Sequence, residues 1–233
     1  VSTVAGVPLG LFLAAHLSWH APFFGIAALV GLLCLGAWRT LPPLDAHLHH
    51  PDRVSVWRSI GQVLAEPNHL KAFALSGLMM FAGFTVIPYI TIYLQANAGM
   101  TAEQVPWTYL FGGVATLLTA RLFGKWTDQV GKVLMFRRMA LAVTLPLMAT
   151  TLSQGLPLAG LWLISTVFFT LMSGRMIPGM ALVSAAVEPR LRGTFMTLNS
   201  AVQSGAMGLA AMVGGLVIGR DAQGQLTHYW VAG

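Results

Sequence analysis

Residues 105–153 read VPWTYLFGGVATLLTARLFGKWTDQVGKVLMFRRMALAVTLPLMATTLS, two apolar runs joined by a short basic connection. The runs, 105–126 and 133–153, are both close to the roughly 20 residues that a helix needs to cross a bilayer. Lys132 lies in the connection, and positive charge in short loops stays on the cytoplasmic side of a membrane. The stretch therefore predicts two consecutive membrane-spanning helices whose connection, 127–132, faces the cytoplasm.

The composition of the whole chain agrees with a membrane protein. Of 233 residues, 56% are apolar and 9% are charged, whereas a soluble domain has roughly 25% charged residues. So few polar side chains cannot cover a water-soluble globule, and so many apolar ones exclude disorder. The single cysteine, Cys34, excludes an intrachain disulfide and a metal site built from cysteines. We therefore expect an all-α membrane protein that crosses the bilayer several times.

Five further apolar runs bring the expected spans to seven: 1–17, 21–41, 70–96, 157–187 and 193–219. We expect the chain to be a fragment of a longer protein that has more spans. The run 157–187 is too long for one straight helix and contains Pro178, so we expect it to bend or to leave the bilayer there.

Positive charge alternates along the connections between these runs. Connections 42–69, 127–132 and 188–192 carry Lys or Arg, whereas 18–20, 97–104 and 154–156 carry none. The basic connections should face the cytoplasm. The net charge of +6 is then a topology signal, and we expect no nucleic-acid partner.

The only long polar segment is 42–69, which leaves two spans before it and five after it. Within it, Val56, Trp57, Ile60, Val63 and Leu64 recur at helical spacing, which predicts an amphipathic helix along the inner membrane face. His47, His49 and His50 lie between prolines, and we expect them to be solvated and not to form a metal site.

The connection 127–132 and the residues before it hold the most specific motif, Gly124-x3-Asp128-x2-Gly131-Lys132. Gly124 would let two helices approach closely, and Gly131 would permit a left-handed turn in a very short loop. Asp128 would place a negative charge beside a helix end. The helix dipole favours such a charge at the N-terminus of a helix. The plainer alternative is an ordinary basic loop with a turn glycine.

Small residues at four-residue spacing mark the first and last spans as candidates for close helix packing. In the first span Gly6 and Gly10 flank Pro8, which would bend the helix. In the last span the repeated small residues include Gly208, Gly215 and Gly219. Generic membrane packing explains each pattern equally well.

The chain resembles the major facilitator superfamily of transporters in these motifs. Gly124-x3-Asp128-x2-Gly131-Lys132 is similar to the family's loop between helices 8 and 9, although Gln129 stands where the family has a basic residue. Gly6-Val-Pro8-Leu-Gly10 resembles the opening of helix 5 in efflux members, and the tail from Arg192 to Gln203 is similar to the sugar-efflux or arabinose-efflux-permease branch.

The resemblance implies a fold of two six-helix bundles that rock about a central cavity. Residues 1–41 would be the last two helices of the N-terminal bundle, 42–69 the cytoplasmic linker, and 70–233 a C-terminal bundle without its last helix, so the chain would cover helices 5 to 11 of twelve. By the implied symmetry, Asp128 would cap the start of the first span near Ser2 and Thr3 and latch the cytoplasmic side shut.

Polar residues inside spans are candidates for a substrate cavity; they are Thr85, Tyr89, Tyr93, Arg175, Asn199 and Gln203. The tyrosines could instead anchor a helix at the membrane interface. Arg175 has no acid inside any span to pair with, so it should snorkel, meet a backbone carbonyl, contact a further helix or face an anionic substrate.

We expect a secondary transporter that exports a small organic solute, a sugar or a drug-like molecule, by alternating access and in exchange for protons. It should be a monomer in the inner (cytoplasmic) membrane, with lipid, a small-molecule substrate and protons as partners and with no cofactor or metal. No set of catalytic residues is recognisable, so we expect no enzyme. The alternatives are a seven-helix receptor, which would have the opposite orientation, and a membrane subunit that transports nothing.

Overall fold

The computed structural model describes residues 6–41 and 55–233. Its helices are α1 (Val7–His16), α2 (Ala21–Thr40), α3 (Val56–Ala65), α4 (Pro67–Phe84), η3 (Ile87–Tyr89), α5 (Ile90–Ala96), α6 (Val105–Val130), α7 (Lys132–Thr151), α8 (Leu158–Ala185), η4 (Pro189–Leu191), α9 (Arg192–Val217) and α10 (Tyr229–Ala232). Two short strands, β1 (Gly219–Arg220) and β2 (Leu226–Thr227), pair as an antiparallel hairpin between α9 and α10. The described part of the chain is all-α apart from this hairpin.

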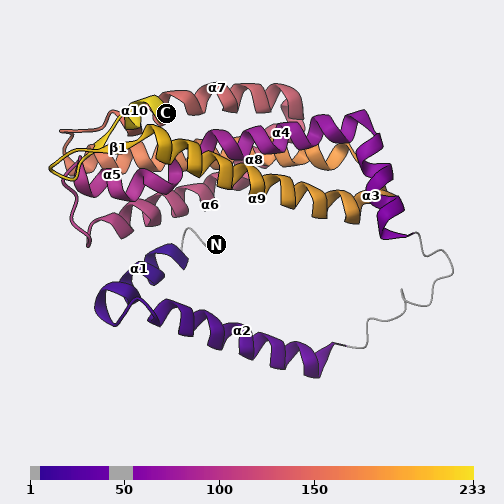
Figure 1. Cartoon of the computed structure of the whole chain (residues 1–233), viewed down its shortest axis with the longest axis horizontal. Helices are drawn as coiled ribbons and strands as arrows, with labels where there is room; N and C mark the ends of the chain where they lie inside the picture. The colour runs from indigo at the N-terminus through magenta and orange to yellow at the C-terminus, as the bar shows by residue number, and fades with distance from the viewer. Residues whose placement is uncertain (1–5, 42–54) are drawn as a thin grey trace.

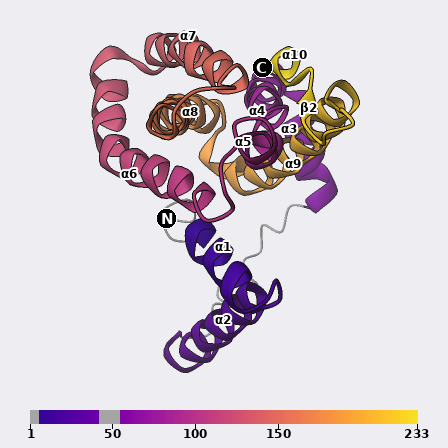
Figure 2. The same cartoon turned by 90° about the vertical axis from the view of Figure 1, so that its left-hand side faces the viewer.

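Helix α8 is the centre of the bundle. It contacts α4, α6 and α7, and α4 contacts α9 on its other side (Figure 2). A helix that is apolar on nearly every face can be surrounded in this way, and α8 buries residues as far apart as Leu161 and Val183. Helix α1 contacts α6 and α2, and α2 lies apart from the bundle and runs roughly along it (Figure 1).

Within residues 6–41 and 55–233, five helical segments are long and apolar enough to cross a membrane: Ala21–Thr40, Pro67–Ala96, Lys132–Thr151, Leu158–Ala185 and Pro189–Val217. They correspond to five of the seven expected spans. The described part of the first span, α1, has only 10 residues. Helix α6 has 26 residues but carries Arg121, Lys125 and Asp128, which lower its apolar content; it nevertheless packs along α8 as the other bundle helices do.

The expected span 70–96 is interrupted between α4 and α5. Pro88 has no N–H to donate, and the chain there makes the tighter bonds from Val86 N to the Gly83 carbonyl (3.2 Å) and from Tyr89 N to the Val86 carbonyl (3.0 Å). In contrast, α8 continues through Pro178 as one helix of 28 residues.

The connection predicted at 127–132 is shorter than expected. Helix α6 continues to Val130, so Gly124 and Asp128 are helical, and α7 begins at Lys132. Only Gly131 separates the two helices, with φ +93° and ψ 141°, a conformation that only glycine adopts without strain. The prediction that Gly131 permits the turn is confirmed, whereas the extent of the loop was wrong because the residues before it are compatible with a helix.

Helix α9 ends at Val217, and Gly219 pairs with Thr227 in the hairpin. The expected span therefore ended too late, and Gly219 lies in a strand, not on a helix-packing face. Asn97, just after α5, holds the hairpin by donating to the Leu226 carbonyl (2.9 Å) and accepting from its N–H (2.8 Å).

Tyr229 of α10 lies beyond the long helices and donates to the Val86 carbonyl at the α4–α5 break (3.1 Å). Burial raises the pKa of Tyr229 well above its ordinary value, so the hydroxyl stays protonated and remains a donor. The segment after α9 is thereby fixed to the interruption of the neighbouring helix.

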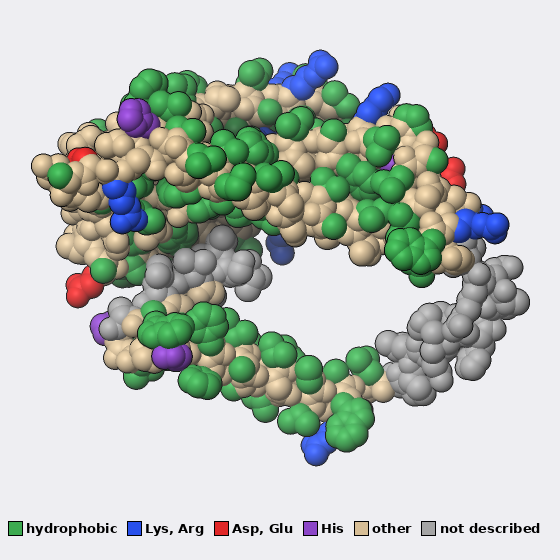
Figure 3. Space-filling model, viewed as in Figure 1, with side chains coloured by type: hydrophobic (Ala, Val, Ile, Leu, Met, Phe, Trp, Pro, Cys, Tyr) green, Lys and Arg blue, Asp and Glu red, His purple; other side chains and the backbone are tan. Residues whose placement is uncertain are grey.

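Much of the outer surface is apolar, over both α2 and the bundle (Figure 3). Helix α2 has no buried residue, and α3, which forms the expected amphipathic helix, buries Val63 while Val56 and Trp57 are exposed. Such surfaces are suited to contact with lipid. The predicted linker residues 42–54, with His47, His49 and His50, lie outside the described residues.

Candidate functional site: a methionine-lined cavity beside α8

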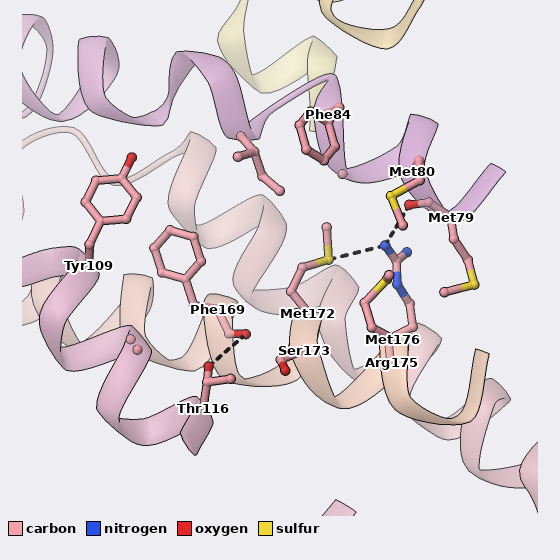
Figure 4. Close-up of a pocket in the computed structure, with 14 residues that line it drawn as sticks. Met79, Met80, Phe84, Tyr109, Thr116, Phe169, Met172, Ser173, Arg175 and Met176 are labelled. Carbon is pink, nitrogen blue, oxygen red and sulfur yellow. Dashed lines mark hydrogen bonds between the residues drawn. The ribbon is translucent and has the colours of Figure 1, made fainter. Parts of the chain in front are cut away.

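A cavity of about 460 Å³ lies between α4, η3, α6 and α8 (Figure 4). Its lining comprises Met79, Met80, Gly83, Phe84, Ile87, Tyr109, Gly112, Gly113, Thr116, Phe169, Met172, Ser173, Arg175 and Met176. Half of these residues are methionine or aromatic, and only a few are polar, which is the usual character of a small-molecule site. The volume is within the range of such sites.

Arg175 supplies the only charge among these lining residues. Its side chain is 8% exposed, and one terminal nitrogen, Nη2, donates to the Met79 carbonyl (3.1 Å) and to Met172 Sδ (3.3 Å). One of the four alternatives expected for Arg175, a backbone carbonyl, is thus confirmed. Its Nε is buried and has no hydrogen-bond partner among the described residues.

Three hydroxyl groups complete the polar lining. Tyr109 Oη shares a hydrogen bond of 2.7 Å with Thr91 Oγ1 of α5, and Thr116 Oγ1 makes a long bond of 3.5 Å to the Phe169 carbonyl. Ser173 lines the cavity from α8, two residues before Arg175. The three hydroxyl groups are placed to hydrogen-bond a ligand that also contacts the guanidinium of Arg175.

The close contact between α6 and α8 shapes one wall of the cavity. A Cβ added at Gly112 of α6 would lie 2.7 Å from Cδ2 of Phe169 on α8. The glycine therefore allows the Phe169 ring to lie against the α6 backbone, and both residues line the cavity.

Of the six predicted cavity residues, only Arg175 lines this cavity. Tyr89 donates to the Ala211 carbonyl on α9 (2.7 Å), and Thr85 bonds within its own helix to Ala82 (3.3 Å). Tyr93 is buried with its ring 4.5 Å from the ring of Tyr229. Tyr89 is thus turned to α9 and Tyr93 to α10, and none of the three residues lines the cavity.

The two predicted cavity residues on α9 also have contacts within the bundle. Asn199 is buried and accepts a hydrogen bond from Ser76 Oγ of α4, and Gln203 Nε2 reaches Met180 Sδ of α8 at 3.6 Å. Their roles in substrate binding remain predictions.

The residues of the predicted latch lie at the α6–α7 junction. Asp128 and Lys132 are exposed, and both line a shallow second cavity of about 590 Å³ with Thr127 and Leu182. Ser2 and Thr3, which Asp128 was expected to cap, lie outside the described residues. Among the described residues a Cβ at Gly124 would meet no atom within 4 Å, so the expected close helix approach there stays a prediction.

The glycines predicted to pack helices behave differently from one another. Cβ atoms at Gly10 and Gly208 would meet nothing within 4 Å, so neither supports a close contact within the described residues. A Cβ at Gly215 would lie 2.8 Å from Tyr89 Oη. Gly6 is the N-cap of α1, and Pro8 lies in the first turn, where proline fits without loss of a helical hydrogen bond.

The sequence reasoning missed most of the cavity lining. Phe169, Met172, Ser173 and Met176 follow each other at helical spacing on α8, a pattern that would have indicated one face. The partners from α4 and α6 require knowledge of how the helices pack. In the described ranges, no three His, Cys, Asp or Glu residues are grouped to hold a metal.

A comparison with known protein families covers most of the chain. A family model described as Major Facilitator Superfamily matches residues 1–218. Members of that family are membrane transporters, and the match agrees with the apolar helices of the bundle. The chain therefore belongs to the major facilitator superfamily of membrane transporters and is a multi-pass membrane protein.

Proposed function

We propose that the protein is a secondary active transporter that exports a small organic solute by alternating access, and that the cavity beside α8 is part of its solute pathway. The observation that carries the proposal is the cavity of about 460 Å³ whose apolar lining contains a single buried guanidinium. A site of this kind can desolvate a small molecule and fix its orientation with few polar groups.

We further propose that a proton gradient drives export and that the protein acts in the cytoplasmic membrane as a monomer. The five described acidic side chains, Glu66, Glu103, Asp128, Glu188 and Asp221, are all exposed. The described residues therefore offer no buried carboxylate as a proton relay, and coupling must be measured. The sugar-efflux branch and the division at 42–69 into two bundles are parts of the same proposal.

The function is tested with the full-length protein in sealed liposomes. Uptake of labelled sugars, lipophilic amines and aromatic acids is measured with and without an imposed pH gradient. Ser173→Trp would fill the cavity from α8 and should abolish flux, whereas Leu163→Trp, at an exposed position of the same helix, should keep it.

Equal flux for wild type and Ser173→Trp would remove the cavity from the pathway. Absence of flux for every solute, with correctly inserted protein, would favour the receptor or the non-transporting subunit. Flux that does not respond to the pH gradient would refute proton coupling but not transport.

A further inference from the structure

We propose that the cavity beside α8 binds an organic anion, whose carboxylate or similar group pairs with Arg175 and whose apolar body lies among the methionines and aromatic rings. This inference rests on the proposed function, because it names the class of solute for the same site. The key observation is the buried position of the charged side chain of Arg175.

Arg175 is a buried cation for which the described residues provide no counter-charge. More than nine-tenths of its surface is buried, and all the described Asp and Glu side chains are exposed. A buried arginine that lacks an anionic partner is costly. Its two contacts, the Met79 carbonyl and Met172 Sδ, are neutral, and a thioether sulfur is a weak acceptor.

The guanidinium also retains a buried donor, Nε, that has no partner among the described residues. Three buried side-chain atoms lack a partner in the described part of the chain: Thr108 Oγ1, Trp162 Nε1 and Arg175 Nε. Of these residues only Arg175 lines the cavity. In Figure 4 the guanidinium lies among Met80, Met172 and Met176, with dashed bonds toward Met79 and Met172.

An oxyanion complements these features better than a neutral or cationic solute does. The guanidinium fork matches the planar oxygens of a carboxylate, and such charge-assisted bonds are about twice as strong as neutral ones. A cation would be repelled by Arg175. The remaining lining, which includes Phe84, Phe169 and Met176, offers nonpolar contact to the rest of the molecule.

The experiment compares two probes of nearly equal shape, 4-phenylbutanoate and 4-phenylbutanamide, binding to the full-length protein in nanodiscs of uncharged phosphatidylcholine. We expect the carboxylate to bind at least about tenfold more tightly than the amide, the usual size of a hydrogen bond to a charged group. Arg175→Gln should reduce the ratio to about one. The matched control Arg138→Gln, at an exposed site on α7, should keep the wild-type ratio.

A second measurement uses the wild-type protein, so that the inference can be tested even if Arg175→Gln does not fold. Modification of Arg175 by phenylglyoxal, read by mass spectrometry, should be slowed by the butanoate and not by the amide. A ratio of one in wild type, a ratio unchanged in Arg175→Gln, or equal protection by both probes would overturn the inference.

The flux assay separates this inference from the proposed function. Flux of neutral or cationic solutes together with a probe ratio of one would leave the transporter standing and reject the anion. A high ratio without flux of any solute would support the anion site and reject transport.

Discussion

Ser76 of α4 donates its hydroxyl hydrogen to the side-chain oxygen of Asn199 on α9, so two buried polar groups 123 positions apart in sequence satisfy each other. The bond lies one helical turn before Met79 and Met80, the first cavity residues of α4. It ties α9 to α4 in a region where most contacts, such as the stacked rings of Phe73 and Phe195, are apolar.

A double-mutant cycle of Ser76→Ala and Asn199→Ala should reveal this bond. We expect a coupling free energy of about 0.6–1.7 kcal/mol, because bonds between membrane helices are modest when the unfolded state also finds partners. Unfolding by denaturing detergent, followed by circular dichroism, gives the four free energies. Strictly additive losses would show that the two side chains do not interact.

Gly214→Ala should destabilise the protein more than Gly208→Ala. A Cβ at Gly214 would lie 2.8 Å from the Thr85 carbonyl, which is backbone and cannot move aside freely, whereas a Cβ at Gly208 meets nothing within 4 Å. Forcing the helices apart should cost about 1–3 kcal/mol. Gly208→Ala should be neutral or stabilising by up to about 1 kcal/mol. Thermal unfolding in detergent measures both, and similar melting temperatures would contradict the close approach of α9 to the α4–α5 break.

Gly131→Ala should strain the junction of α6 and α7. The φ of +93° at Gly131 is unfavourable for any residue with a Cβ, and we expect a loss of about 1–3 kcal/mol in the free energy of unfolding. Gly193→Ala, in the first turn of α9 with no atom within 4 Å of its Cβ, is the control and should cost nothing. Equal stability of the two variants would argue for a different junction.

Asp128→Asn tests the latch. If Asp128 holds the cytoplasmic side shut by its charge, the variant should lose most of its transport rate while still inserting into the membrane. Glu103→Gln, an exposed acid before α6, should transport as the wild type does. Liposome flux at matched protein amounts is the measurement, and an unchanged rate for Asp128→Asn would remove the latch.

The sequence predicted the long helices because apolar runs of bilayer length have few alternatives. The expected 133–153 and 193–219 agree closely with α7, Lys132–Thr151, and α9, Arg192–Val217. It did not predict the hairpin at Gly219, because strands of two residues leave no periodic pattern.

The site was harder to predict than the helices. Arg175 could be recognised because a lone charge inside an apolar run is conspicuous. Tyr89 and Tyr93 were selected by their spacing, but spacing within one helix does not reveal which neighbour that face meets. The methionines of α4 and α8 read as ordinary core residues until the packing brings them around one space.

Four methionines in the cavity wall, Met79, Met80, Met172 and Met176, have a consequence for selectivity. Their unbranched side chains can change rotamer at little energetic cost, so the cavity wall can adapt to ligands of different shape. The guanidinium is held by the Met79 carbonyl and does not share that freedom. We therefore expect the site to select ligands by the position of their negative charge and to accept apolar groups of many shapes.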